Sequence, residues 1–390
     1  MRNFLHLRAD LWLPLGIGMA ALLLYATSAA PGIVELFDDT LEFQIVGPTF
    51  GIAHPTGYPL YILLSGVWSR LLLPVGEWAW RMNLFSAVCG AATVGITAHL
   101  GARLAPLPRP WNQFSGLAAA LAFGLGAVWW SQTTVAEVYA LHMLFVALTL
   151  AQTLAILDAG ADQTADPPQA SQHNIQVRRV AQLCLLLGLG LAHHRTTALL
   201  LPSIGLLLLW QQPALLRPRR AWFTWLGALL LPLLLYLWLP LRATQGARDL
   251  HGSYTNTWRG FWDHVLARDY MAFFSENPLM VSRTPSDWLA LAVAQLGVPA
   301  LLLAGIGLLL FPLLRAQMSP LRQSHDAPGW ALIGLTLATN LGFAYFYRVG
   351  DVEVFLLPAF LCAALLAGLG LGTLLHLLLG SPPAIRHSVA

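Results

Sequence analysis

The chain has 390 residues, of which 57% are hydrophobic and 10% are charged, and its mean hydropathy is +0.64. Because roughly a quarter of the residues in a soluble domain are charged, this composition excludes a soluble globule and indicates an integral membrane protein. The formal net charge of +3 comes from arginines scattered among apolar segments, a pattern that excludes nucleic-acid binding. The chain contains no lysine, so a fixed cation must be an arginine or a protonated histidine.

Apolar runs of about 20 residues, the length that crosses a bilayer, recur along the whole chain. The predicted spans lie near 11–30, 82–102, 114–130, 135–157, 196–212, 221–240, 288–314, 329–347 and 352–379, with a shorter one at 180–192. The segment 57–74 is apolar but is interrupted by Pro59, Gly66 and Arg70. It therefore fits either an eleventh span or a helix at the outer surface.

The positions of the arginines decide between these two topologies. Without the eleventh span, the arginine-bearing loops at 103–109, 178–179, 217–220 and 315–322 are all cytoplasmic, as the positive-inside rule requires. If segment 57–74 is an eleventh span, all of these arginine-bearing loops lie on the outer side of the membrane. We therefore expect an all-α polytopic bundle of about ten transmembrane helices, forming a single domain over residues 1–380 with a cytoplasmic tail at 381–390. Segment 57–74 is then an interfacial or re-entrant helix within an outer loop at 31–80, and a second, aromatic outer loop at 241–287 packs on the membrane or caps a cavity.

Ionisable and polar side chains recur at the predicted outer ends of the spans. They are Asp38, Asp39, Glu42 and His54 after the first span, Glu137, Tyr139 and His142 in AEVYALH, His193, His194 and Arg195 in LAHHRTT, Arg242 in LPLRA, and Arg348, Asp351 and Glu353 in YRVGDVEVF. Taken singly, each fits a solvated loop, a headgroup anchor or a polar contact between helices. Their gathering on one side of the bundle favours a functional site there, because ionisable groups are costly to bury in a membrane.

Other kinds of site lack their sequence signals. No HxxxH or HxH motif occurs, and the three cysteines lie in apolar runs without CxxC spacing. There is no P-loop, no GxSxG elbow and no GxGxxG after a strand. We therefore expect no metal site and no nucleotide-driven transport.

Several stretches, taken in order, resemble one family of membrane enzymes. They are DDTLEF, GIAHPTGYPLY, WRMNLFSA, AEVYALH, LGLGLAHHRTT, YLWLPLRA, WRGFWDHVLARDY and GDVEVFLLPAF, and they extend from about Glu35 to Pro358. The family comprises integral-membrane glycosyltransferases of the GT-C type and includes protein O-mannosyltransferases that act on plexin-type domains. Its acidic motif, Asp-x-Gly-Glu-Phe, falls on 39–43 with Leu41 in place of glycine, and Thr56 replaces the second proline of its His-Pro-Pro-Gly-Tyr-Pro motif.

The resemblance implies transfer of a sugar, with mannose as a candidate, from a polyprenyl phosphate to a hydroxyl group of a protein, glycolipid or polysaccharide. The reaction would take place at the outer or periplasmic face of the plasma (inner) membrane. The expected partners are the lipid-linked donor, the hydroxyl acceptor and membrane lipids, with no nucleic acid, no divalent metal and no other cofactor. Because the departing phosphate needs no proton, one carboxylate base suffices, and a positive charge must hold the phosphate.

The same resemblance assigns roles to individual residues. Asp39 is the expected general base, and Glu42 and His54 are further catalytic residues that position the base or bind sugar hydroxyls. Arg242, Arg195 or a histidine holds the phosphate. The other expected substrate-binding residues are Asp38, Tyr58, Glu137, Tyr139, His142, His193, His194, Asp351 and Glu353.

Two other functions fit the same pattern of polar groups. One is a transporter or lipid flippase, although such proteins place charge or broken helices near the midplane, whereas the middles of most predicted spans here are purely apolar. The other is a non-catalytic factor of envelope assembly, which would tolerate the loss of Asp39.

The predicted topology can be tested with single cysteines in a variant that lacks the three native ones. In intact cells, Pro110→Cys should resist a membrane-impermeant thiol reagent because its loop is cytoplasmic, whereas Asn256→Cys should be labelled. Permeabilised cells serve as the control, in which both positions should react. Labelling of position 110 in intact cells would contradict the ten-span topology.

Overall fold

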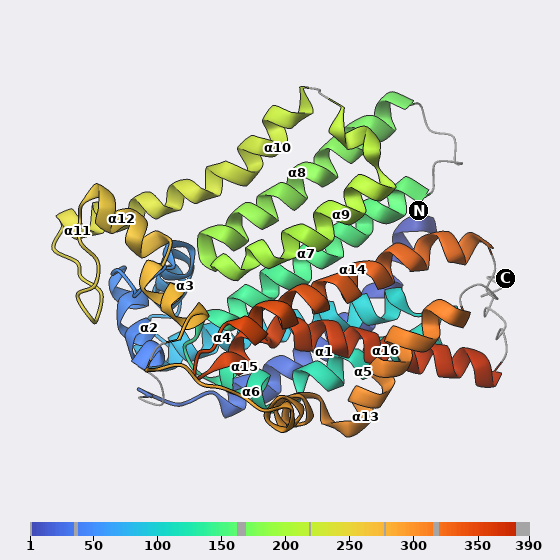
Figure 1. The fold of residues 1–390 in the computed structure, drawn as a ribbon, viewed down its shortest axis with the longest axis horizontal. Coiled ribbons are helices and arrows are strands. Elements are labelled where there is room, and N and C mark those ends of the chain that lie inside the picture. The colour runs from blue at the N-terminus through green and yellow to red at the C-terminus, as the bar shows by residue number, and fades with distance from the viewer. Residues whose placement is uncertain are drawn as a thin grey trace.

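A computed structural model describes residues 2–34, 38–161, 169–217, 220–276, 278–314 and 320–379, except for the side chains of 2–10, 38, 160–161, 169–173, 216 and 320–326. This described part contains helices and no strand (Figure 1). The α-helices are α1 (Arg2–Ser28), α2 (Asp38–Thr49), α3 (Pro59–Leu71), α4 (Trp78–Leu104), α5 (Asn112–Gly124), α6 (Ala127–Thr134), α7 (Val138–Ala161), α8 (Gln169–His193), α9 (Leu201–Gln211), α10 (Ala221–Leu230), α11 (Trp238–Thr244), α12 (Trp258–Val265), α13 (Pro285–Leu314), α14 (Pro320–Phe346), α15 (Val352–Phe355) and α16 (Leu357–Leu379). Short 3-10 helices are η1 (Arg195–Leu200), η2 (Pro213–Leu216), η3 (Leu231–Leu237) and η4 (Arg268–Phe274).

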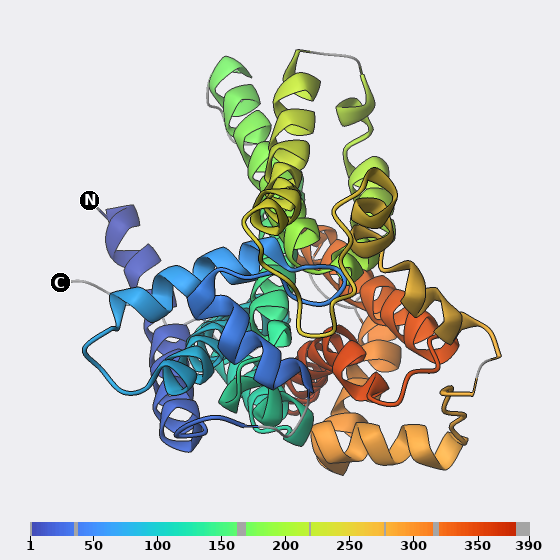
Figure 2. The same ribbon diagram turned by 90° about the vertical axis from the view of Figure 1, so that its left-hand side faces the viewer.

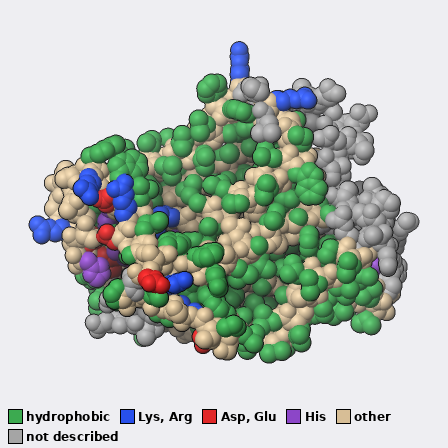
Figure 3. Space-filling model, in the orientation of Figure 1, with side chains coloured by type: hydrophobic (Ala, Val, Ile, Leu, Met, Phe, Trp, Pro, Cys, Tyr) green, Lys and Arg blue, Asp and Glu red, His purple; other side chains and the backbone are tan. Residues whose placement is uncertain are grey.

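The long helices run side by side as a bundle (Figure 1). In the described residues, 8 helical segments are long and apolar enough to cross a membrane, or up to 9 if the bent pair of α5 and α6 is one span. Helices α4, α7 and α16 are mostly buried, whereas α1, α13 and the continuous segment 221–244 expose most of their side chains. Those exposed side chains are largely apolar, and hydrophobic groups cover the broad flank in Figure 3. An apolar flank of this kind suits lipid contact, and the predicted all-α polytopic membrane fold is confirmed.

Three predicted spans differ in detail from the observed helices. The span near 180–192 is part of the longer α8, because the glutamines and arginines that precede it are good helix formers. The span at 196–212 consists of the 6-residue η1 and the 11-residue α9. The span at 114–130 is bent by 69° between α5 and α6. The number of ten spans therefore stays a prediction.

A buried glutamine accounts for the bend between α5 and α6. The Gln295 amide donates to the Phe123 carbonyl at 3.2 Å, and its oxygen accepts from the Trp129 backbone N–H at 3.1 Å. A Cβ at Gly126 would lie 2.0 Å from the Gln295 Nε2, so only glycine leaves room for that side chain. Gln295 thus satisfies the backbone groups that the break sets free, which an apolar environment requires.

Helix α13 changes direction at Gly297, which has φ 72° and ψ 157°. Its first part, up to Leu296, lies across the end of the bundle, and the part after Gly297 runs along it (Figures 1 and 2). Glycine adopts this positive φ without strain, and Pro299 starts the second part, where its missing N–H costs nothing. The predicted span at 288–314 falls on α13, which is long and apolar enough to cross a membrane and turns at Gly297.

The helices of the predicted outer loops gather at one end of the bundle, at the left of Figure 1, and the start of α1 and the end of α16 lie at the other end. Helices α2 and α3, blue in Figure 2, lie across the ends of the long helices. Helix α3 has 13 residues and is about 20 Å long, whereas the hydrocarbon core is ~30 Å thick. This length fits the predicted surface helix and not an eleventh straight span.

The positive φ at Gly297 gives a prediction on stability. Gly297→Ala should lower the free energy of unfolding by roughly 1–3 kcal/mol, because an L side chain is strained at this positive φ. The matched control is Gly305→Ala, where nothing lies within 4 Å of the added Cβ and helix propensity predicts a gain of about 0.5–1 kcal/mol. Thermal unfolding in detergent compares the two, and an equal loss in both variants would argue against strain at Gly297.

Candidate active site

The site is built on the turn that connects α2 to α3. Asp39 and Glu42 lie three residues apart in α2 and so share one face of the helix. After α2 the chain folds back through a buried segment at 51–58. Gly57 permits this return, because it has φ +83° and because a Cβ there would lie 2.6 Å from a Leu239 methyl group. The turn brings His54 back against the Asp39 and Glu42 face.

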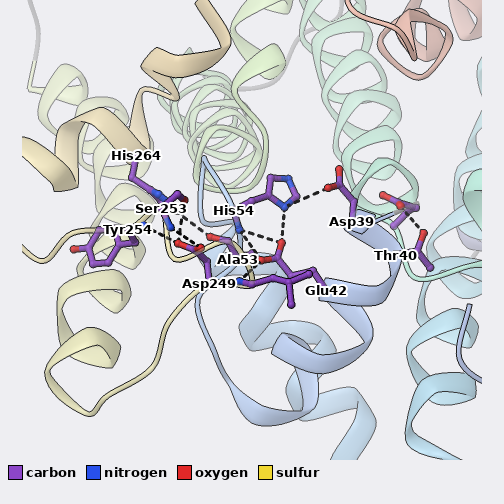
Figure 4. A network of polar contacts seen from close by, with 11 residues as sticks. Asp39, Thr40, Glu42, Ala53, His54, Asp249, Ser253, Tyr254 and His264 are labelled. Atoms are coloured by element: carbon purple, nitrogen blue, oxygen red, sulfur yellow. Dashed lines mark hydrogen bonds and ion pairs between the residues drawn. The ribbon is translucent and has the colours of Figure 1, made fainter. Parts of the chain in front are cut away.

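Glu42 and His54 form a buried pair (Figure 4). The Glu42 Oε2 lies 2.5 Å from the His54 Nδ1 and 3.0 Å from the His54 backbone nitrogen, while Oε1 accepts from the Leu250 N–H at 3.0 Å. Burial would raise the pKa of Glu42, but the hydrogen bond and charge of His54 and the two backbone N–H groups outweigh it and lower the pKa. For His54, burial would lower the pKa, but the hydrogen bond to Glu42 and the surrounding carboxylates raise it. The pair is therefore ionised, with the proton on His54.

Asp39 is the accessible carboxylate beside this pair. Its Oδ1 lies 3.6 Å from the His54 Nδ1, and its side chain is 44% exposed, against 1% for Glu42. The oxygens of Glu42 are occupied by His54 and Leu250, so Glu42 orients the imidazole, and Asp39 is the carboxylate placed to accept a proton.

The outer loop 241–287 closes over the turn through a second set of polar contacts (Figure 4). Asp249 accepts hydrogen bonds from the backbone of Ser253 and Tyr254 at 2.8 and 2.7 Å, which shapes the loop. The His264 Nε2 donates to the Ala53 carbonyl at 3.0 Å. Sequence reasoning assigned no role to Asp249 or His264. The feature of the sequence that could have indicated these two residues is their position as polar residues within an aromatic loop.

Two adjoining cavities open at this end of the bundle. The acidic cavity, of about 450 Å³, is lined by Asp39, Ala127, Val128, Ser131, Gln132, Glu137, Tyr139, Asp351, Glu353 and Val354. The aromatic cavity, of about 260 Å³, is lined by Asp39, His54, Pro55, Thr56, Tyr58, Tyr139, His194, Arg195, Thr196, Tyr270, Phe273, Phe274, Phe343, Tyr347, Val349, Asp351 and Phe355. Asp39, Tyr139 and Asp351 line both, so Asp39 lies where a carboxylate-rich space meets a space that contains an arginine and many rings.

The structure brings most of the predicted site residues to these two cavities. Those that line one or both are Asp39, His54, Tyr58, Glu137, Tyr139, His194, Arg195, Asp351 and Glu353. Tyr270, Phe273 and Phe274 show that the aromatic outer loop covers a cavity, as expected. Thr196, Tyr270 and Tyr347 were not predicted individually, although each lies next to or within a quoted motif.

Four predicted residues do not line either cavity, and the Asp38 side chain lies outside the described residues. Glu42, His142 and His193 are buried behind the lining residues. Arg242 donates from Nε to the Phe50 carbonyl at 2.6 Å and from Nη2 to the Thr49 carbonyl at 3.3 Å. Its guanidinium thus binds the carboxyl end of α2, where free carbonyls attract a cation.

Glu137 differs from the other carboxylates of the acidic cavity. It is 3% exposed, its Oε1 accepts from the Thr40 hydroxyl at 2.7 Å, and its Oε2 has no hydrogen-bond partner within the described chain. Burial raises the pKa of Glu137 to about 8, and the negative charge of Asp39 adds to the shift. Glu137 is therefore mostly protonated at neutral pH and can donate a hydrogen bond.

Among the residues that the structure describes, no group of three or more His, Cys, Asp or Glu side chains could hold a metal ion.

Solved structures define the class of this fold. The chain superimposes on ArnT from Cupriavidus metallidurans bound to undecaprenyl phosphate with a TM-score of 0.56 and 16% identity, covering 92% of this chain and 59% of that one. It superimposes on the archaeal oligosaccharyltransferase AglB from Archaeoglobus fulgidus, in complex with an inhibitory peptide and a dolichol-phosphate, with a TM-score of 0.57 and 11% identity, covering 94% and 51%. The chain therefore shares its fold with these two proteins, in agreement with the GT-C type fold that the sequence resemblance implies.

Sequence comparison narrows this class. The family described as "Protein O-mannosyl-transferase TMEM260 N-terminal domain" matches residues 39–216. The mouse protein O-mannosyl-transferase TMEM260 is 27% identical over 351 residues, which cover 86% of this chain and 46% of the mouse protein. A Dictyostelium discoideum relative of the same name is 28% identical over 119 residues, 29% of this chain and 13% of that protein. The chain is similar to the TMEM260 protein O-mannosyl-transferases and spans about half the length of the mouse protein, so the resemblance seen in the sequence is confirmed.

The raised pKa of Glu137 predicts how stability changes with pH. The folded protein keeps the Glu137 proton up to about pH 8, whereas the unfolded chain loses it near the ordinary value of 4.5. This group therefore reduces stability as pH rises between those values, by at most about 1.4 kcal/mol per unit. Glu137→Gln, which resembles the protonated acid, should flatten that decline in thermal unfolding measured from pH 5 to 8. The half-buried Glu353→Gln is the control and should leave the decline unchanged.

Proposed function

We propose that this protein transfers a sugar from a polyprenyl-phosphate donor to a hydroxyl acceptor. The observation that carries the proposal is the position of Asp39, beside a buried imidazole–carboxylate pair and between a carboxylate-lined and an arginine-bearing cavity. The names of the relatives support mannose as the sugar and a protein as the acceptor. The undecaprenyl phosphate and dolichol-phosphate bound to the solved neighbours support a lipid-phosphate donor.

The aromatic cavity suits the phosphate end of the donor. Phe273, Phe274 and Phe343 offer apolar surface to the first isoprene units, and Arg195 offers a guanidinium that can bind phosphate oxygens bidentately. Charge develops on the phosphate as the sugar leaves, so a fixed cation here stabilises the transition state more than the ground state. Arg195 fits this role better than Arg242 because it lines the cavity, where its Nη1 also donates to the Leu266 carbonyl. Arg242 lies outside the cavity and binds the carbonyls of Thr49 and Phe50.

The acidic cavity suits the sugar and the acceptor hydroxyl. Ser131, Gln132, Asp351 and Glu353 provide donors and acceptors for hydroxyl groups. Glu137, when protonated, adds a donor in a space otherwise rich in acceptors. With the sugar in this cavity and the phosphate in the aromatic cavity, the bond that breaks lies near Asp39, which lines both.

The proposed reaction needs one base. Asp39 takes the proton of the acceptor hydroxyl as its oxygen attacks the anomeric carbon, and the bond from that carbon to the phosphate oxygen breaks, so that the polyprenyl phosphate leaves with the electron pair. His54, whose Nδ1 lies 3.6 Å from the Asp39 Oδ1, places a positive charge beside this carboxylate. Glu42 balances the charge of His54.

The site is proposed to face the outside or periplasm, in the plasma (inner) membrane. This orientation rests on the arginine-bearing segments at 103–109, 178–179, 217–220 and 315–322, which the positive-inside rule assigns to the cytoplasm. The proposed catalytic unit is residues 1–380, with 31–80 and 241–287 as its outer segments and 381–390 as a tail that lies outside the described residues.

Replacement of the base tests the reaction. Asp39→Asn keeps the size of the side chain but removes its basicity, so turnover should fall by roughly 10²–10⁴-fold while donor binding is largely kept. The control is Asp269→Asn in η4, an exposed acid that lines neither cavity. Purified protein would be assayed for mannose transfer from polyprenyl-phosphate mannose to protein and glycolipid acceptors. Full activity in Asp39→Asn would remove the base role, and transport of donor without transfer would favour a flippase.

Substitutions of Arg195 and Arg242 separate phosphate binding from a structural role. Arg195→Gln should weaken donor binding by about 2–5 kcal/mol, the scale for removing one partner of a buried charged contact. Arg242→Gln should leave donor binding nearly unchanged and lower stability instead, because it loses hydrogen bonds to the end of α2. Donor titration and thermal unfolding of both variants provide the comparison. If Arg242→Gln weakened donor binding more than Arg195→Gln, Arg242 and not Arg195 would be the residue that binds the phosphate.

A further inference from the structure

A threonine and two histidines next to the aromatic cavity form a short hydrogen-bonded chain. The Thr196 hydroxyl lies 2.6 Å from the His194 Nδ1 and 3.0 Å from the His142 Nε2. The rings of His142 and His194 stack with centroids 4.5 Å apart. His142 belongs to α7, whereas Thr196 lies in η1, so the chain joins two elements behind the cavity.

Backbone geometry identifies which nitrogen of His194 carries the proton. The Thr196 backbone N–H also donates to the His194 Nδ1, at 3.4 Å. A nitrogen that accepts from an amide has no proton of its own, so a neutral His194 carries its proton on Nε2. Within the described residues, no group accepts a hydrogen bond from that Nε2, and the ring lines the aromatic cavity beside Arg195. This N–H is therefore available to donate to a group bound in the cavity.

The direction of the other two hydrogen bonds follows. Because the His194 Nδ1 can only accept, the Thr196 hydroxyl must use its single proton to donate to it. The hydroxyl oxygen then accepts from the His142 Nε2–H. The remaining His142 nitrogen, Nδ1, is buried and has no partner in the part of the chain that the structure describes, which fits an unprotonated atom. Each member of the chain thus fixes the proton position of the next.

We infer that Thr196, oriented by His142, is a positioning residue that holds His194 as a neutral donor, whose Nε2–H binds a phosphate oxygen of the polyprenyl phosphate. This inference rests on the proposed function, and it gives His142 a role through Thr196 and not through contact with substrate. Burial lowers the pKa of His194 well below its usual range, and the neighbouring His142, His193 and Arg195 add to the shift. A neutral His194 can donate to the phosphate without the like-charge repulsion that a protonated imidazole would have with the neighbouring Arg195 guanidinium.

Two substitutions at one position separate the hydroxyl from the shape of the side chain. Thr196→Ser keeps the hydroxyl, whereas Thr196→Val keeps the shape and removes it. With undecaprenyl phosphate as the probe, Thr196→Val should weaken binding roughly 3- to 10-fold, the effect of one misplaced neutral hydrogen bond, and Thr196→Ser should bind like the wild type. In transfer assays the loss should appear in KM for the donor more than in kcat.

Nitrogen-15 NMR of histidine-labelled wild-type protein reads the tautomer directly, with the His194 signals assigned by their absence in His194→Gln. A protonated Nε2 and an unprotonated Nδ1 on His194 support the inference, and the opposite tautomer overturns it even if Thr196→Val fails to fold. Equal binding by Thr196→Ser and Thr196→Val also overturns it, as does wild-type protein that does not bind undecaprenyl phosphate. Hydroxyl-dependent binding without sugar transfer would support the inference and refute the proposed function. Sugar transfer that is equal in the wild type and in Thr196→Val would support the proposed function and refute the inference.

Discussion

The buried pair of Glu42 and His54 is the contact on which the site depends. Its hydrogen bonds join three parts of the chain, because Glu42 belongs to α2, His54 to the turn before α3, and the Leu250 N–H to the outer loop. An unpaired charge left in such a place costs several kcal/mol, so neither partner is stable there without the other. The pair therefore fixes the position of the imidazole beside Asp39, and it holds the outer loop over the cavities.

Three carboxylates within this end of the bundle have different environments. Glu42 is buried but paired, and its pKa is lowered, whereas Glu137 is buried with one hydroxyl partner, and its pKa is raised to about 8. Asp39 is half-exposed between the two cavities. Burial and hydrogen bonding thus separate the protonation states of Glu42 and Glu137, while Asp39 is the most accessible of the three carboxylates.

The rest of the fold obeys the constraint that backbone polar groups in an apolar environment need partners. Regular helix satisfies this along most of the bundle, and irregular backbone occurs where side chains or the outer end provide the partners. Gln295 forms hydrogen bonds with the Phe123 carbonyl and the Trp129 N–H at the break between α5 and α6. Arg242 binds the last carbonyls of α2. At this end helices stop, turn and leave polar groups available to line the two cavities.

Composition and hydropathy by themselves determined the membrane class, the positions of most helices and the side on which polar groups gather, because these follow from local runs of side chains. The ordered motifs also indicated Asp39, His54 and Arg195. Only the tertiary structure decided that Glu42 is occupied by His54, that Arg242 binds α2, that Gly297 turns α13 aside, and that Thr196 orients His194. These outcomes depend on contacts between distant residues, such as Glu42 and Leu250, which are 208 positions apart. Periodicity describes one helix at a time, and it carries no information on which loop packs against which turn.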